Sequence, residues 1–108
     1  MIDPKENRIS NIETLIDQNA DRHKEADDDD DFIWESLENE VMRAILEYCR
    51  DFDLAVPGYD LSETLENDDP DEIESVIVFM NDNAAKIEAT ASELVEYYFQ
   101  KFWPDEDV

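Results

Sequence analysis

The longest hydrophobic pattern in the chain lies between Asp69 and Trp103. Its apolar residues, spaced mostly three and four positions apart, are Ile73, Ile77, Met80, Ala84, Ile87, Ala91, Leu94, Tyr98 and Phe102. This spacing places them on one face of an α-helix. Asp69 can cap the helix and Pro70 suits its first position, so we predict one continuous helix, about 50 Å long, that ends before Pro104. The segment 81–83 is its weakest part, and a division into two helices there stays open.

Two helical patterns precede this segment. A narrow apolar stripe that includes Ile12 and Ile16 predicts a helix from about Pro4 to about Lys24. A broader stripe predicts a second helix from about Asp31 to about Phe52. The aspartate run 27–31 disfavours a helix interior but suits a helix N-terminus, so we predict a loop that caps the second helix.

The stretch between the second helix and the long helix is irregular and acidic. Pro57-Gly58 marks a turn, and Asp60 can cap a short helical piece that ends near Glu66. Gly58 is the only glycine, which argues against a sheet with tight hairpins. We therefore predict an all-α fold: a single acidic helical domain over residues 1–108, with a long C-terminal helix and a frayed tail over about 104–108.

Charge is the most unusual property of the chain. It has 32 acidic and 8 basic residues, a formal net charge of −24, and no Lys or Arg between Asp51 and Ala85. Such a surface repels nucleic acids and anionic membranes and attracts the proteins that bind them. A halophilic proteome would also be acidic, although the many large apolar residues argue against it. An acidic interaction tail would hold its charge in one block, whereas here the charge is spread along the chain.

Patterns that would indicate catalysis or metal binding are missing. His23 is the only histidine, and we expect a solvated side chain without a partner nucleophile. Cys49 is the only cysteine, which rules out an internal disulfide, fits a reducing cytosol and predicts a small buried hydrophobe. One Cys and one His cannot form a zinc site, and the run 27–31 lacks the ligand spacing of a calcium loop. We expect no enzyme activity, no cofactor and no metal.

No stretch predicts a signal peptide or a membrane span. The N-terminus lacks an apolar signal segment, and no apolar run approaches the roughly 18 residues that a membrane span needs. We therefore expect a soluble, cytoplasmic protein.

The remaining hypothesis is electrostatic. Phosphates on one DNA strand advance about 3.4 Å per base, and acidic side chains four residues apart on a helix lie about 6 Å apart. Carboxylates on rigid helices can therefore approximate a phosphate array. Because non-specific DNA binding rests mainly on Lys and Arg contacts to phosphate, such a protein could occupy a DNA-binding groove without chemistry of its own.

The order and character of these segments resemble the phage anti-restriction DNA mimics of the Ocr (overcome classical restriction) type. The resemblance lies in the length, the acidity, the N-terminal helix, the Asp-rich approach at 27–31, the irregular acidic stretch 51–69 and the long helix starting near Asp69. It implies a homodimer shaped like bent B-form DNA, acting in the host cytoplasm. The implied target is the DNA groove of a type I restriction–modification enzyme or another DNA-handling host protein. The chain departs from this pattern in its continuous second helix, which carries Arg43 and Arg50 on its outer face.

The predicted partner-binding surface contains acidic residues from the irregular stretches and the helix surfaces. These residues are Asp27, Asp28, Asp29, Asp30, Asp31, Glu35, Asp51, Asp53, Asp60, Glu63, Glu66, Asp68, Asp69, Asp71, Glu72, Glu74, Asp82, Glu93 and Glu96. On the long helix, a wheel at 100° per residue places four of them opposite the apolar stripe, namely Asp71, Asp82, Glu93 and Glu96. We expect this surface to bind a protein with a basic groove, and to bind neither nucleic acid nor membrane directly.

Three aromatic residues lie off the apolar stripe of the long helix: Phe79, Tyr97 and Phe99. One hypothesis is that they form a dimer interface, because a chain of this length buries only about two-thirds of its unfolded surface and extra apolar surface often marks a contact. The same rings can instead pack against the first helix and the turn 54–59. The sequence leaves both arrangements open.

Two other classes of function also fit the sequence. One is an acidic inhibitor or chaperone of another basic protein, such as a nuclease, a histone-like protein or a CRISPR effector. The other is an acidic coiled-coil oligomer whose charge only keeps it soluble. Salt separates these hypotheses, because phosphate mimicry weakens steeply with ionic strength while an interface with buried apolar contacts does not.

Overall fold

The computed structural model describes residues 4–25 and 31–102, with only the backbone described at positions 31 and 32. The described residues form α-helices and one short 3-10 helix, with no strand among them. In order, these are α1 (Pro4–Glu25), α2 (Asp31–Asp51), α3 (Leu61–Asn67), α4 (Pro70–Asp82), η1 (Ala84–Lys86) and α5 (Ala89–Phe102). The all-α prediction is confirmed, as are the approximate bounds of the first, second and short helices.

Aspartates cap the two helices in the acidic middle of the chain. The Asp60 carboxylate accepts a hydrogen bond from the Glu63 amide at 3.3 Å, and α3 begins there. The Asp69 carboxylate accepts one from the Asp71 amide at 3.0 Å, and Pro70 is the first residue of α4. Both capping predictions are therefore confirmed, because a short polar side chain satisfies amides that the first helical turn leaves free.

The prediction of one continuous helix over 69–103 is wrong, and the division into two helices near 81–83, which the sequence left open, is confirmed. The backbone leaves the helical conformation at Asn83 (φ −121°, ψ 42°), whose side-chain amide donates to the Phe79 carbonyl at 3.0 Å. After η1, the Glu88 carboxylate accepts hydrogen bonds from the amides of Thr90 (3.0 Å) and Ala91 (3.2 Å), so it caps a new helix, α5. The poor helix formers of segment 81–83 and this second cap explain the break.

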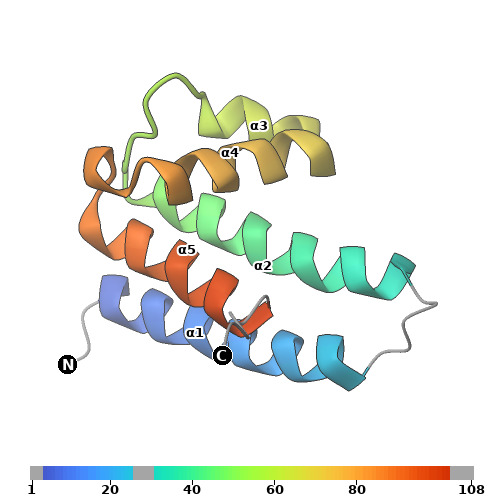
Figure 1. Cartoon of the computed structure of the whole chain (residues 1–108). Helices are drawn as coiled ribbons and strands as arrows, with labels where there is room; N and C mark the ends of the chain where they lie inside the picture. The colour runs from blue at the N-terminus through green and yellow to red at the C-terminus, as the bar shows by residue number, and fades with distance from the viewer. Residues whose placement is uncertain (1–3, 26–30, 103–108) are drawn as a thin grey trace.

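α2 is the central helix of the fold. It contacts α1, α3, α4 and α5. Figure 1 shows α1, α2 and α5 lying alongside one another, with α3 and α4 covering another side of α2. The described residues measure 38 × 34 × 28 Å, so they are compact and contain no 50 Å rod.

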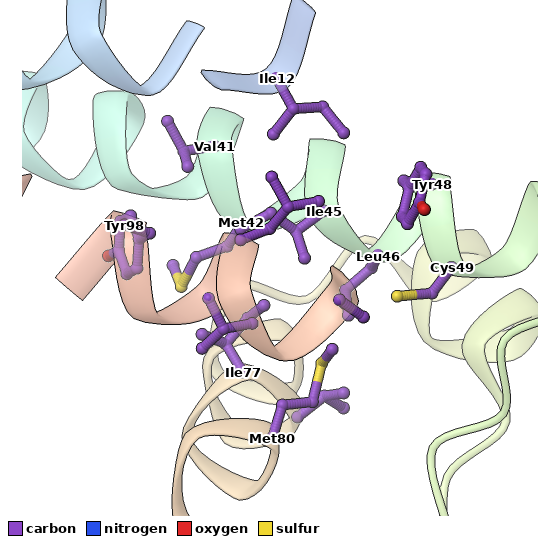
Figure 2. Close-up of a cluster of buried hydrophobic side chains, with 14 of the residues drawn as sticks. Ile12, Val41, Met42, Ile45, Leu46, Tyr48, Cys49, Ile77, Met80 and Tyr98 are labelled. Atoms are coloured by element: carbon purple, nitrogen blue, oxygen red, sulfur yellow. The ribbon is translucent and has the colours of Figure 1, made fainter. Parts of the chain in front are cut away.

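The core gathers around the buried residues of α2. Side chains from the other helices, including Ile12, Ile77 and Tyr98, converge on α2 in Figure 2. Every residue of the predicted apolar stripe is buried except Ala84. Val76 and Val95 lie off that stripe and are also fully buried, because α4 and α5 are each packed against more than one neighbour. The break at Asn83 lets both halves of the stripe enter a single core.

Candidate functional site

Three exposed acids lie at the start of α3 and along it, with no Lys or Arg between them in the sequence. Asp60, which caps α3, is exposed, and Glu63 and Glu66 are exposed on the helix three residues apart, so these two lie about 4.5 Å apart along the helix axis. Glu63 and Glu66 lie on the side of α3 opposite its buried residues Leu61 and Leu65. We call these three acids the α3 ridge. Residues 60–82 contain nine acids and no Lys or Arg, so the ridge belongs to the most negative part of the described fold.

A groove lies between α2 and α4. It has a volume of about 430 Å³. Five acids line it, three of them on α4 or at its start and two on α2: Asp69, Asp71, Glu74, Glu35 and Glu38. Met42 and Asn39 of α2 also line it. We call this feature the α2–α4 groove. Because its acids come from segments more than 30 positions apart, the fold and not the local sequence brings them together.

Glu38 is the half-buried acid among the five that line the groove. Its pKa is raised, first because burial disfavours the charged form and then because Glu74 and Glu35 add negative potential. Its Oε1 also lies 3.3 Å from Nε2 of His23. Glu38 thus lies where the acidic groove meets the buried histidine.

His23 is buried, so the prediction of a solvated side chain is wrong. It is 6% exposed, and its ring lies 4.7 Å from that of Trp34 and 5.0 Å from that of Phe102. Burial lowers the pKa of His23. Cys49 is buried as predicted, and burial, followed by the charge of Glu88, raises its pKa to about 12. A thiol with this pKa is a poor nucleophile at neutral pH.

Two acids of the predicted surface form ion pairs with arginines, which neutralise part of their negative charge. Arg8 of α1 bonds Asp51 at 2.8 Å, and Arg50 lies 3.1 Å from the same carboxylate. The hydrogen bond from Arg8 is the main reason that the pKa of Asp51 is lowered. Arg43 of α2 bonds Asp68 at 2.5 Å. Asp51 and Asp68 therefore link elements of the fold and contribute less free negative charge than predicted.

The remaining predicted acids are distributed over several parts of the molecule. Glu72 is half-buried and accepts hydrogen bonds from Thr64 and Asn67 of α3, each at 3.4 Å. Asp53, Asp82, Glu93 and Glu96 are exposed. The row of Asp71, Asp82, Glu93 and Glu96 predicted on one helix is wrong, because the first two belong to α4 and the others to α5. The prediction for residues 27–30 and for the side chain of Asp31 lies outside the described residues.

The three off-stripe aromatic residues have partners within the chain. Phe79 packs edge-on against Tyr59 at 5.3 Å between ring centroids, as the alternative with the turn 54–59 predicts. The Tyr97 hydroxyl donates to the Asp17 carboxylate of α1 at 2.5 Å, which raises the pKa of Tyr97 to about 12. Phe99 lies against Tyr98 at 5.0 Å. All three rings are half-buried against the core of a single chain.

Comparison of the chain with protein-family models, curated proteins and solved structures identifies no significant match. The likeness to the Ocr type therefore stays a resemblance of order, length and charge. None of the helices in the described ranges combines the length and apolar content needed to cross a membrane. Within those ranges, no three His, Cys, Asp or Glu side chains are grouped so that they could hold a metal ion.

Proposed function

We propose that this protein is a DNA-mimic inhibitor that occupies the phosphate-binding groove of a DNA-binding enzyme. The observation that carries the proposal is the α3 ridge: closely spaced carboxylates, held on a capped helix, in a segment of nine acids without a single Lys or Arg. A groove that binds DNA through Lys and Arg contacts to phosphate would accept such a ridge. The target implied by the Ocr resemblance is a type I restriction–modification enzyme.

The size of the molecule limits how much DNA one chain can imitate. Its longest dimension, 38 Å, corresponds to about 11 base pairs of B-form DNA at about 3.4 Å per pair. A mimic of a longer duplex needs a second copy, in line with the homodimer that the resemblance implies. Because Phe79, Tyr97 and Phe99 already have partners in the chain, we do not assign a dimer interface to them.

The arrangement of the apolar residues weighs against the coiled-coil alternative. A coiled coil needs an apolar seam that faces another chain. Here the stripe residues Ile77, Met80 and Leu94 are at most 2% exposed and pack within the monomer. The helices of the α3–α4 region are also short, at 7 and 13 residues.

A competition assay tests the proposal. A type I restriction–modification enzyme is bound to a labelled DNA duplex, and the protein is added at several salt concentrations. We expect it to displace the duplex at low salt and to lose this ability steeply as salt rises, because the contact is between exposed charges. If it displaces DNA neither from this enzyme nor from unrelated DNA-binding proteins, the proposal is wrong.

A further inference from the structure

The α2–α4 groove adjoins two further hollows, and we call the three together the depression. Three adjoining hollows share Glu74. Next to the α2–α4 groove, one hollow is lined by Ser75 and Val78 of α4. The other hollow is lined by Tyr98 and Phe99 of α5. Val78 is 41% exposed and lines two of the hollows. The depression therefore has acids at one end and large apolar side chains at the other.

The length of the depression suits about two turns of a helix. On α2 its lining runs from Glu35 to Met42, and on α4 it runs from Pro70 to Val78. At 1.5 Å per residue these segments span about 10 and 12 Å, while one helical turn rises about 5.4 Å. An amphipathic helix that binds in a groove typically anchors through apolar residues three and four positions apart, which two turns can supply.

The charge of the depression selects a cationic occupant. Among the described residues that line the three hollows there is no Lys or Arg. Five acids line the α2–α4 groove, and Glu74 and Glu35 add, after burial, to the raised pKa of Glu38, so a guanidinium or ammonium group would relieve repulsion among them. A second copy of the chain, with its net charge of −24, is a poor occupant.

We propose that the α2–α4 groove and its apolar end bind a basic amphipathic helix of the protein partner. Apolar side chains of that helix would lie on Met42, Val78 and Phe99, and its Arg or Lys residues would reach Glu35, Asp71 and Glu74. Long basic side chains suit this arrangement, because their stems can cover apolar surface while their charged ends contact carboxylates. The inference rests on the proposed function in one respect: it assigns this helix to the DNA-binding enzyme that the protein is proposed to inhibit.

The test uses fluorescently labelled synthetic peptides and anisotropy with the full-length protein. The probe is a helical peptide with leucines at positions i and i+4 flanked by arginines. One control peptide replaces its leucines by serine at equal charge, and the other replaces its arginines by glutamine. We expect the probe to bind at least about tenfold more tightly than either control, because both kinds of contact contribute. Equal binding of the probe and the serine peptide would overturn the proposal, because charge alone would then explain binding.

Variants of the protein locate the contact. Glu35→Gln with Glu74→Gln, and separately Val78→Asn, should each weaken probe binding at least about fivefold while the helical circular dichroism stays unchanged. A matched variant on α1, Glu6→Gln with Glu13→Gln, removes the same charge at exposed positions outside the groove lining and the α3 ridge, and should change probe binding less than about twofold. Equal losses in the groove and α1 variants would contradict a groove site. Failure of the protein to displace DNA in the competition assay would refute the mimic proposal without affecting this result.

Discussion

Val76 and Val78 provide a matched test of how α4 is packed. They are the same residue type two positions apart, yet Val76 is fully buried and Val78 is 41% exposed. Val76→Ala removes two buried carbons, which costs about 1.6 kcal/mol in transfer free energy. A residual cavity of roughly 40 Å³ adds about 1 kcal/mol, and the better helix propensity of alanine offsets about 0.5 kcal/mol. We therefore expect Val76→Ala to lower the free energy of unfolding by about 2 kcal/mol.

Val78→Ala should leave stability nearly unchanged, because the smaller loss of burial and the gain in helix propensity nearly cancel. Thermal unfolding followed by circular dichroism measures the difference. An unfolding entropy of about 2.1 cal/mol/K per residue gives about 0.23 kcal/mol/K for 108 residues, so 2 kcal/mol corresponds to a decrease of about 9 °C in Tm. Equal Tm values for the two variants would refute the packing of α4 described above.

Three further predictions concern titratable groups. Cys49 should react with a thiol reagent only as the chain unfolds, because burial raises its pKa to about 12; rapid labelling of the folded protein would contradict its buried position. His23 should titrate by NMR below its usual pKa of about 6.5. Between that lowered pKa and about 6.5, the His23 side chain is protonated more in the unfolded chain than in the folded one. The free energy of unfolding should therefore fall as pH falls through this window, and the His23→Gln variant should lack this pH dependence. Arg8→Gln should raise the pKa of Asp51 toward its usual value in a carboxyl NMR titration, and should cost at most about 1 kcal/mol because the pair is partly exposed.

Local sequence patterns predicted the helices well, because caps and apolar periodicity act over a few residues. Asp60 and Asp69 begin helices where the sequence predicts, and every stripe residue of the C-terminal third except Ala84 is buried. The break at Asn83 was harder to predict because the apolar spacing continues across it. Glu88 contributes to the break, because its side chain caps the start of α5. A residue that caps a new helix cannot also lie in the interior of a continuous one.

The candidate site was less predictable, because charge pairing depends on residues distant in the chain. Arg8 and Asp51 are 43 positions apart, and Arg43 and Asp68 are 25 apart. The ion pairs that neutralise these two aspartates therefore follow only from the fold. The α2–α4 groove likewise requires α4 to pack beside α2. The sequence shows that no Lys or Arg lies between Asp51 and Ala85, but the arrangement of the acids in this stretch depends on the packing of α3 and α4 against α2.

The salt dependence of target binding tests the mimic proposal most directly. The dissociation constant for a type I restriction–modification enzyme is measured from low to physiological salt for the native protein and for a ridge variant, Asp60→Asn with Glu63→Gln and Glu66→Gln. A control variant, Glu13→Gln with Glu93→Gln and Glu96→Gln, makes the same change in net charge at exposed positions on α1 and α5.

If the ridge carboxylates replace phosphates, each contributes roughly 0.7 to 0.9 to the slope of log affinity against log salt. We therefore expect the ridge variant to bind more weakly, with a slope shallower by about 2, and the control variant to stay close to the native protein. Equal slopes and affinities for the ridge variant and the native protein would contradict the proposal that the α3 ridge replaces DNA phosphates.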